Sequence, residues 1–588
     1  MPITNPYVFG APVKTREMFF GRDDVFAFLQ EHLTGTYQDN VIMLYGQRRT
    51  GKTSLLYQLL HSDYVTATYL PIFISLEGLQ DFETNAHVFL EIARKIASIL
   101  HMRPPKAEQL DVTNSYFRYN FLEKRVKSRL NGRKLLLMID EYEVLEACVE
   151  NPETQVSPVL FHQLRHVMQH YDWLSFLLVG SYKLEELEAQ YWKEFTGALY
   201  HTISFIDAAS ARALIEMPAR RFSVRYTAEA VDRLLELSGN HPYFLQSLCR
   251  FAYANGAAAG AITRQHVEDA VSPCLEAIRN GFESIWRDVQ RDEQIILATV
   301  AHMEILYLTL SDIVGQLEYW HIDWPLERVK SLVKQVERKE FLERTELRHY
   351  RYTVPFLEQC IRTYQPIDLV LNGLNIHRDH TADALRDPNF FKAEKNLRDA
   401  EEFAQSGDIS KAEQTFHFVL ETYPDYVDCW LRFGAFYEWQ GKWDEALELY
   451  QQRLKDDAGS VEMSNTIALF LKRRYRFHDA LEQFRTSLDI QSGNAVALAN
   501  SEEIEYWLAL DTEEQRLDYC LIPLAEELRS LDRKIDDLNR PRQAASPTTN
   551  ARLRQFRERA TQIERKFHDL QAQFPTEDLE SRLSMASK

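Results

Sequence analysis

A glycine-rich stretch is the part of this sequence best equipped for chemistry. It runs Gly46-Gln-Arg-Arg-Thr-Gly-Lys-Thr-Ser54 and matches the pattern G-x-x-x-x-G-K-[ST]. Gly46 and Gly51 carry no Cβ, so the backbone between them can wrap closely around a phosphate group. Amide groups of the loop and of the following helical turn would present positive partial charge to that phosphate. We predict that a nucleotide is bound by Gly46, Gln47, Arg48, Arg49, Thr50, Gly51, Lys52, Thr53 and Ser54.

Two side chains at the end of this loop predict how the nucleotide is held. Lys52 would place its charge on the β- and γ-phosphates, and Thr53 would offer its hydroxyl to Mg²⁺. The apolar run at residues 41–45 predicts a buried strand before the loop, and residues 55–60 predict a helix after it. This setting between strand and helix favours a true phosphate loop over a loop that binds nothing.

A second apolar run, residues 134–139, ends in Asp140 and Glu141. A buried parallel strand here would deliver Asp140 beside Thr53, where the two would hold Mg²⁺ directly or through water. Glu141 would then polarise the attacking water as general base. The predicted catalytic set is Lys52, Asp140 and Glu141. A solvated turn position for Glu141 and competition from Glu143 are the alternatives.

Three further apolar runs, residues 69–76, 174–180 and about 200–206, predict more strands, with helical patterns between them. Such alternation predicts a parallel sheet covered on both faces. Ser181 follows the run at 174–180 and is a candidate sensor of the γ-phosphate. An N-cap for a following helix is an equally favoured interpretation of Ser181.

Four motifs occur in a fixed order: Phe20-Gly-Arg22, the phosphate loop, the strand ending in Asp140, and Gly239-Asn-His-Pro242. Together they resemble the STAND class of P-loop ATPases, in particular its archaeal-ATPase-like or AAA-like branch in prokaryotes. The resemblance covers roughly residues 1–365. It implies ATP or ADP with Mg²⁺, held by a nucleotide domain, a helical lid and a winged helix that close over the nucleotide.

The same resemblance implies roles for residues outside the loop. In that family the Gly-x-Pro segment contacts the base, which makes Asn240, His241 and Pro242 candidates for the base pocket. The segment around Arg22 would flank the adenine. No residue reliably matches a transferred arginine finger, and Arg220 and Arg221 are candidates by position alone.

Residues of about 280–365 show three helical patterns followed by a hairpin pattern, which predicts a winged helix. A DNA-reading third helix normally has a clearly basic face, and this one is mixed in sign. Its charged residues are Glu327, Arg328, Lys330, Lys334, Glu337 and Arg338. We therefore favour a packing role over DNA binding for this part.

From about residue 398 the chain repeats with a period of 34. Three columns align: Ala412, Ala446 and Ala480; Phe416, Tyr450 and Phe484; Leu420, Leu454 and Leu488. The pattern resembles tetratricopeptide repeats, whose stacked helix pairs form a curved surface that binds a peptide or protein. A purely structural spacer is the alternative.

Heptad-like spacing continues to the end of the sequence, with leucine or isoleucine at 524, 528, 531, 535 and 538 and a second stripe from 553 to 574. Residues 540–550 interrupt it. An excess of acids on the first stripe and of bases on the second supports an antiparallel helical hairpin, either a projecting arm or a cap on the repeats.

The 588 residues are too many for one core, and we expect a multidomain α/β plus α protein. The predicted regions are a parallel-sheet P-loop core (1–207), a helical lid (208–278), a winged helix (279–365), a connector (366–397), repeats of tetratricopeptide type forming an α-solenoid (398–500) and the helical hairpin or coiled-coil arm (501–588).

Composition narrows the partners and the compartment. The net charge of −19 opposes wholesale binding to nucleic acid or anionic membranes. Six scattered cysteines contain no C-x-x-C pair, which favours neither zinc nor a disulfide framework. The sequence shows no signal-peptide pattern and no apolar run near the ~18–20 residues of a membrane span. We therefore expect a cytoplasmic protein.

These observations predict an ATP-dependent regulatory switch with slow, Mg²⁺-dependent hydrolysis. The repeats would sense a ligand or protein, and the output would pass by conformational change or self-assembly, as a nucleotide-dependent homo-oligomer or to an effector in trans. A role in prokaryotic defence follows from family analogy alone. The alternatives are a DNA-handling ATPase that uses the winged helix and a scaffold that holds nucleotide for structural reasons.

Overall fold

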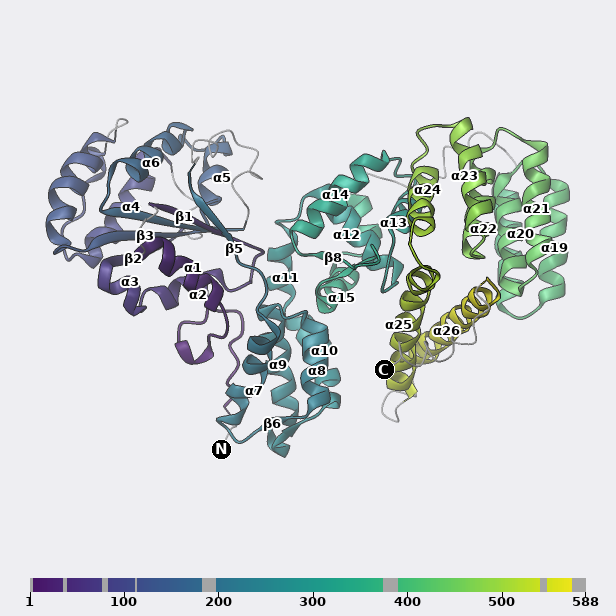
Figure 1. Cartoon of the computed structure of the whole chain (residues 1–588), viewed down its shortest axis with the longest axis horizontal. Coiled ribbons are helices and arrows are strands. Elements are labelled where there is room, and N and C mark those ends of the chain that lie inside the picture. Colours follow the sequence, from purple (N-terminus) through teal and green to yellow (C-terminus); the bar gives the residue numbers. More distant parts are fainter. Residues whose placement is uncertain are drawn as a thin grey trace. The chain divides into compact units, whose positions relative to one another are not determined.

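The structure is a computed structural model that describes residues 4–34, 40–76, 83–110, 114–181, 197–373, 390–539 and 547–573 (Figure 1). The chain falls into two compact units. The first comprises Met1–Gln290, Lys339–Phe341 and Tyr352–Tyr364. The second comprises Arg291–Arg338, Leu342–Arg351 and Gln365–Lys588.

A five-stranded sheet forms the base of the first unit. Its strands are β1 (Val41–Tyr45), β2 (Tyr69–Ser75), β3 (Lys134–Asp140), β4 (Leu174–Gly180) and β5 (Leu199–Thr202). They lie in the order β2-β3-β4-β1-β5 and pair in parallel. The predicted parallel sheet is confirmed. With β1 second from one edge, the loop after it and the end of β3 meet at the same carboxyl edge.

The predicted fifth strand is too long, since β5 ends at Thr202 rather than near residue 206. The reason is that its partner strand β1 ends at Tyr45, which pairs with Thr202, so the ladder has no partner beyond that point. The Ser204 carbonyl that follows accepts a hydrogen bond from Nη1 of Arg22 at 2.6 Å.

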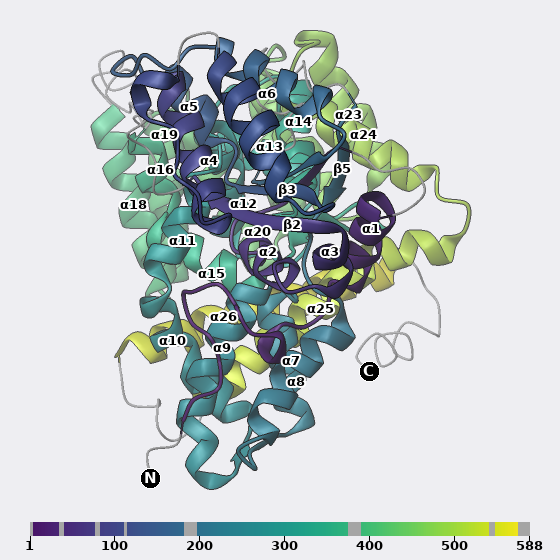
Figure 2. The same ribbon diagram turned by 90° about the vertical axis from the view of Figure 1, so that its left-hand side faces the viewer.

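Helices cover both faces of the sheet (Figure 2). Leu135 and Leu137 of β3 join one core, while Leu136 and Met138 join the other, as alternation along a strand requires. The first core includes α4 (Asn85–Ile99), a π-helix (Tyr116–Val126), α5 (Val144–Glu150) and α6 (Val159–His170). The second includes α1 (Asp23–Thr34), α2 (Lys52–Leu59) and α3 (Asp63–Thr68).

The helical segment that follows contains α7 (Ala208–Arg220), α8 (Ala228–Ser238), α9 (Pro242–Gly256), α10 (Arg264–Ala277) and α11 (Arg279–Trp286). The side chains of Asp207 and Thr227 cap α7 and α8. Pro242 occupies the first turn of α9, as predicted. A short parallel pair, β6 (Arg225–Tyr226) with β7 (Ala261–Ile262), was not predicted.

The order predicted for the winged helix is confirmed. It runs α12 (Arg291–Met303), α13 (Leu310–Tyr319), α14 (Leu326–Arg338), β8 (Leu342–Arg344) and β9 (Tyr350–Tyr352). Helix α15 (Pro355–Tyr364), which follows the wing, belongs to the first compact unit. Helix α16 (Ile367–Gly373) lies against α12 in the second.

Helix pairs form the repeats, with α18 (Phe390–Gln405) and α19 (Ile409–Thr422), α20 (Val427–Gln440) and α21 (Trp443–Asp456), α22 (Val461–Arg473) and α23 (Phe477–Ile490), then α24 (Ala495–Leu508). Ala412, Ala446 and Ala480 are fully buried where the paired helices meet. The large residues of the second aligned column are buried beside them, as the periodicity predicts.

The predicted hairpin is present as α25 (Glu513–Asn539) and α26 (Pro547–Gln573), which pack against each other. Residues 540–546 and Phe574 lie outside the described residues, and α26 begins inside the expected break. Arg559 of α26 bonds to Glu527 of α25 at 2.8 Å. Arg565 donates to the Trp439 carbonyl of α20 at 3.0 Å, which favours the cap on the repeats over a projecting arm.

None of the helices in the described part of the chain has the length and apolar character needed to cross a membrane. The six cysteines are buried free thiols.

Gly434 offers a test of the close approach of α20 and α21. A Cβ there would meet the ring of Tyr450, whereas a Cβ at Gly315 in α13 would meet nothing within 4 Å. Gly434→Ala should lower the free energy of unfolding by about 1–3 kcal/mol through overpacking. Gly315→Ala should raise it by about 0.5–1 kcal/mol through helix propensity. Urea unfolding measures both, and equal shifts of the same sign would contradict this packing.

Candidate functional site

The phosphate loop joins β1 to α2 at the carboxyl edge of the sheet. Gly51 has a φ of +96°, a left-handed conformation that favours glycine. Gly46 is needed for a reason that the motif does not state, because a Cβ there would collide with the carbonyl of Ile203 after β5. One loop glycine therefore serves the turn, and the other serves packing against the neighbouring strand.

Lys52 lies in the hollow of this loop. Its Nζ donates to the carbonyls of Gly46 and Gln47, each at 2.7 Å. Burial lowers the pKa of Lys52 to about 8, while the nearby carboxylates of Glu143 and Asp140 oppose this effect. The ammonium is thus held inside the loop by acceptors that a phosphate group could replace.

The structure brings together the two residues predicted to hold the metal. Oγ1 of Thr53 donates to Oδ2 of Asp140 at 2.6 Å. Asp140 is 3% exposed, and its Oδ1 is buried without a hydrogen-bond partner. Burial raises the pKa of Asp140, against the hydrogen bond from Thr53 and the charge of Lys52. A hydroxyl beside a carboxylate with one unused oxygen is a donor set that fits Mg²⁺.

Two glutamates follow this strand, and each has its own partner. Glu141 has a φ of +60°, a strained conformation of a kind that is common at functional sites. Its Oε1 lies 3.4 Å from Nη1 of Arg48. Oε1 of Glu143 accepts a hydrogen bond from the backbone amide of Ser181 at 3.1 Å. Both candidates for the general base therefore lie at the loop, and the geometry does not choose between them.

Ser181 thus contributes its backbone amide to the site. The helix that it was alternatively expected to cap would begin within residues 182–196, which lie outside the described residues. Its role as a sensor stays a prediction.

Arg22 anchors the loop. Its guanidinium donates to the carbonyl of Thr50 at 2.7 Å and to that of Ser204 at 2.6 Å, and the residue is 8% exposed. These bonds tie the phosphate loop to the chain that leaves β5. The predicted contact of Arg22 with the adenine side stays a prediction, because both bonded nitrogens face backbone.

His241 and Pro242 lie at the start of α9. The His241 ring is fully buried between Phe205 and Phe244, with ring centroids 4.9 and 4.8 Å apart. Its Nδ1 accepts from the amide of Tyr243 at 3.3 Å, so it caps the helix. Burial, reinforced by the charge of Arg22, lowers the pKa of His241 to about 3. His241 is therefore a neutral residue that joins the helical segment to the site.

Other loop residues bond to segments around them. Arg49 lies over the ring of Tyr243, 5.4 Å from its centroid. The Thr50 hydroxyl donates to the Gln47 carbonyl at 2.9 Å. The Ser54 hydroxyl accepts from the amide of Val13 at 2.9 Å, which places the N-terminal segment beside α2.

Sequence reasoning missed two residues that touch the loop. Asp288, just after α11, pairs with Nε of Arg48. The backbone carbonyl of Lys339 accepts a hydrogen bond from the side chain of Gln47. Both lie more than two hundred residues from the loop in sequence. No local motif marks either, so nothing in the sequence pattern could have pointed to them.

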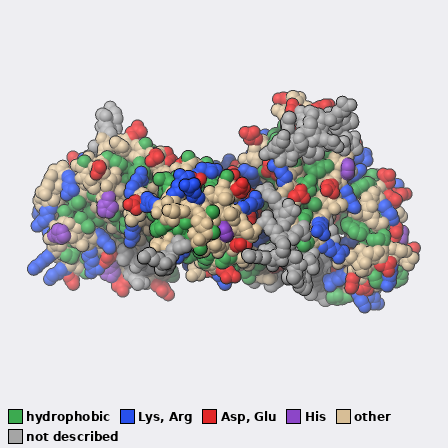
Figure 3. Space-filling view, turned by 90° about the horizontal axis from the view of Figure 1, so that it is seen from below, with side chains coloured by type: hydrophobic (Ala, Val, Ile, Leu, Met, Phe, Trp, Pro, Cys, Tyr) green, Lys and Arg blue, Asp and Glu red, His purple; other side chains and the backbone are tan. Residues whose placement is uncertain are grey.

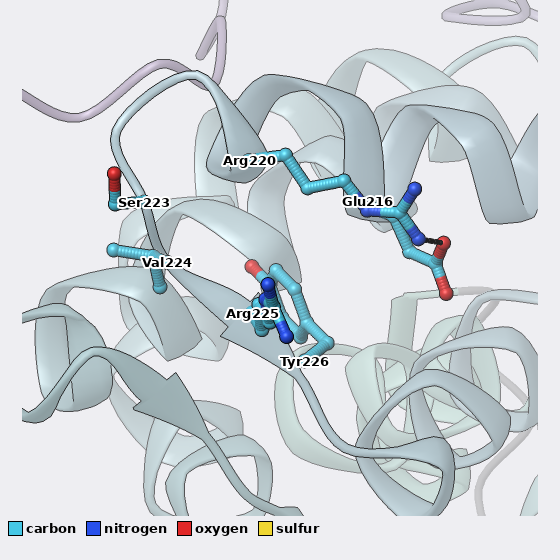
Figure 4. A pocket seen from close by; sticks show the side chains of 6 residues that line it. All are labelled: Glu216, Arg220, Ser223, Val224, Arg225 and Tyr226. Carbon is cyan, nitrogen blue, oxygen red and sulfur yellow. Dashed lines mark hydrogen bonds and ion pairs between the residues drawn. The ribbon is translucent and has the colours of Figure 1, made fainter.

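The arginine-finger candidates lie at the end of α7. Arg220 pairs with Glu216, and Arg221 pairs with Glu17 at 3.0 Å. Arg220 also lines a cavity of about 530 Å³ beside β6 (Figure 4). The cavity is lined by Glu216, Arg220, Ser223, Val224, Arg225 and Tyr226. A role of either arginine at a nucleotide stays untested.

Comparison with known proteins identifies part of the chain. A tetratricopeptide repeat family model matches residues 403–469. These residues are similar to tetratricopeptide repeats. The match spans α19, α20 and α21 and most of α22, which confirms the repeats predicted from the period. A search of the curated proteins found no match.

Several solved structures are similar to the chain at low sequence identity. The Walker-type ATPase of Pyrococcus abyssi is 15% identical, with 60% of this chain and 99% of that chain covered and a TM-score of 0.45. The ORC2 protein of Aeropyrum pernix, solved as ADPNP–ADP complexes, is 14% identical, with 62% and 100% covered and a TM-score of 0.43. The Drosophila ORC bound to DNA is 16% identical, with 61% and 90% covered and a TM-score of 0.32.

The low pKa of His241 gives a testable pH dependence. Unfolding returns the ring to a pKa of about 6.5, so between pH 6.5 and 3 the unfolded chain binds the extra proton and the fold loses stability on acidification. Replacing His241 with asparagine keeps an N-cap but removes this titration. The variant should lose less stability between pH 7 and 5 than the natural chain, by about 1–2 kcal/mol. Urea unfolding at the two pH values measures it. Exposed His478→Asn is the control, and an unchanged pH dependence in His241→Asn would contradict the assignment.

Proposed function

We propose that this chain is an ATP-dependent regulatory switch. The observation that carries the proposal is the contact between Thr53 and Asp140 beside the buried Lys52, at the carboxyl edge of a parallel sheet. In parallel sheets this edge is where ligands bind. The loop, the helix that follows it and the acid at the end of β3 form one compact group that suits a nucleoside triphosphate with Mg²⁺.

The residues of this group divide the task. Backbone amides of the loop and the N-terminus of α2 would bind the phosphates, and Lys52 would add its charge. Thr53 and Asp140 would hold the metal. ATP with Mg²⁺ supplies a transferable γ-phosphoryl group whose charge the metal neutralises. His241, Pro242 and Arg22 remain the residues proposed for the base side.

Slow hydrolysis is proposed because the candidate bases are engaged. Glu141 faces Arg48, and Glu143 accepts the amide of Ser181. A base has to be within reach of the attacking water to accept its proton. A cation beside Glu141 and an amide on one oxygen of Glu143 support regulatory turnover rather than fast turnover, although the other oxygen of Glu143 is buried without a hydrogen-bond partner in the described part of the chain.

A switch also needs an output. The nucleotide can shift a conformational balance only through contacts that differ between ATP and ADP, chiefly those to the γ-phosphate. The repeats offer a surface of a kind that binds proteins or peptides. We propose that they sense a partner in the cytoplasm and that the signal passes to an effector in trans or through self-assembly. Defence signalling rests on the family resemblance alone.

Contacts within the second unit support a packing role for the winged helix. Lys330 of the third helix, α14, pairs with Glu502 of α24 at 2.7 Å, and Arg328 pairs with Asp292 at 2.6 Å. Two of its basic side chains are thus engaged by acids. On the face drawn in Figure 3, side chains of both signs are interspersed. The acids that engage Lys330 and Arg328 of α14 do not favour a DNA-reading surface.

Calorimetry tests the nucleotide site. The natural chain should bind ATP with Mg²⁺ and release heat. Lys52→Ala should weaken this binding about tenfold or more, because it removes a charge-assisted contact to phosphate. Asp140→Asn should reduce the effect of Mg²⁺ while leaving metal-free binding closer to normal. Glu448→Gln, in α21, is the control. Absence of heat with any adenine nucleotide in the natural chain would refute the proposal.

Sedimentation velocity tests the switch. The natural chain should differ in size or shape between ADP and a non-hydrolysable ATP analogue, and Lys52→Ala should not respond to either. With ATP itself, Glu141→Gln should show the size or shape that the natural chain shows with the analogue, because hydrolysis would be blocked in this variant. If the nucleotides bind and no difference appears, the chain is a nucleotide-bound scaffold. A gel shift with duplex DNA at low salt would instead favour the DNA-handling alternative.

A further inference from the structure

Two residues of the phosphate loop bond to the places where the chain passes between its two compact units. Arg48 pairs with Asp288, which lies two residues before the first unit ends at Gln290. Gln47 donates from its side chain to the carbonyl of Lys339, the residue at which the chain re-enters the first unit. Asp288, Lys339 and the loop all belong to the first unit. The loop therefore bonds next to both ends of the segment Arg291–Arg338, which contains α12, α13 and α14 and belongs to the second unit.

The pair of Arg48 with Asp288 is partly shielded from water. The side chains are 28% and 22% exposed. Burial disfavours the charge on Arg48. The carboxylate of Asp288, followed in strength by those of Glu141 and Glu143, outweighs burial and raises the pKa of Arg48 above its usual range. A partly buried, hydrogen-bonded pair of this kind holds its geometry better than an exposed surface pair.

The re-entering segment is fixed on its other sides. Glu340 bonds through its carboxylate to the Ser204 hydroxyl, and its carbonyl accepts from Oγ1 of Thr353 at 2.6 Å. The amide of Thr353 donates to Phe341 at 3.1 Å. Because residues 340 and 341 are anchored in this way, a movement of the loop acts on the chain mainly at Asp288 and Lys339.

Charge around the loop makes the pair between Arg48 and Asp288 open to competition from an added phosphate. The loop cations Lys52 and Arg48 are surrounded by the carboxylates of Asp140, Glu141, Glu143 and Asp288. Asp140 lies against Thr53, and Glu143 accepts from Ser181. Asp288 and Glu141 both face Arg48, and Asp288 makes the closer contact. A γ-phosphate added at the loop would repel Asp288 and attract Arg48.

We propose that Arg48 reads the γ-phosphate by exchanging Asp288 for it, and that this exchange loosens the chain at residues 288–291. With ADP the Arg48–Asp288 pair persists, and residues 288–291 stay in place. With ATP the pair opens, and Gln47 follows because it is the preceding residue of the same loop. This inference rests on the nucleotide site proposed above and assigns to Arg48 and Asp288 the response to the γ-phosphate.

Hydrogen exchange followed by mass spectrometry tests the exchange of partners in the full chain. Peptides covering residues 286–292 and 337–342 should exchange faster with a non-hydrolysable ATP analogue and Mg²⁺ than with ADP and Mg²⁺. Asp288→Asn should exchange fast at 286–292 with either nucleotide, because the charge that holds Arg48 is gone. Glu283→Gln is the matched control. It breaks the 3.1 Å pair between Arg279 and Glu283, both of which lie on α11 just before Asp288, and it does not involve the loop.

Affinity provides an independent readout. Asp288→Asn should bind the ATP analogue about tenfold more tightly, with ADP affinity unchanged, because Arg48 no longer has to leave a carboxylate. Arg48→Gln should lose about tenfold in affinity for the analogue and little for ADP. Thermal unfolding of each variant checks that the fold is intact, and Arg48→Gln covers the case in which Asp288→Asn is unstable.

The outcomes separate this inference from the proposed function. If both nucleotides bind the natural chain but the two peptides exchange equally with each, Arg48 does not read the γ-phosphate and the inference fails alone. Equal losses of ADP and analogue affinity in Arg48→Gln would also overturn it, since they indicate uniform phosphate binding. If no nucleotide binds the natural chain, the proposed function itself fails.

Discussion

The contact between Thr53 and Asp140 is the constraint on which the nucleotide unit depends. It joins the first turn of α2, which follows β1, to the last residue of β3, and one strand, β4, lies between β1 and β3 in the sheet. Burying a carboxylate costs several kcal/mol unless it is paired, hydrogen-bonded or bound to metal. The Thr53 hydroxyl, the charge of Lys52 and the backbone amide of Glu141 offset part of that cost for Asp140, but its Oδ1 is buried without a side-chain partner among the described residues. A buried carboxylate with an unpartnered oxygen supports the cation site proposed for Thr53 and Asp140.

The same region shows why a phosphate loop is more than its motif. Gly46 packs against the carbonyl of Ile203, and Arg22 binds the loop at Thr50 and the chain after β5 at Ser204. These contacts fix the loop against the chain that follows β5. One buried guanidinium therefore ties the loop to the chain that leaves β5.

Local patterns predicted what local forces determine. Strands β1 to β4 and the helix after the loop follow from apolar periodicity. The repeat helices follow from small residues at a fixed period. The meeting of Thr53 and Asp140 followed from the rule that parallel strands end at one edge. Asp288 and Lys339 could not be found in this way. Asp288 follows an ordinary helix, and Lys339 takes part through its carbonyl, a group that every residue carries. The capping role of His241 was equally hidden, since a helix N-cap and a base contact share one position in the sequence.

The second unit explains how a small change at the loop could have a large effect. Lys472 of α22 bonds to Glu503 of α24 at 2.7 Å, and Ser311 of α13 donates to the same carboxylate. The Lys472 ammonium holds the pKa of the buried Glu503 below its usual range despite burial. Breaking a buried pair by removing one partner costs about 3–5 kcal/mol, so this junction resists separation. The winged helix and the last repeats are therefore braced together by charge as well as by apolar packing. If the proposed displacement at residues 288–291 occurs, we expect the winged helix and the last repeats to move together.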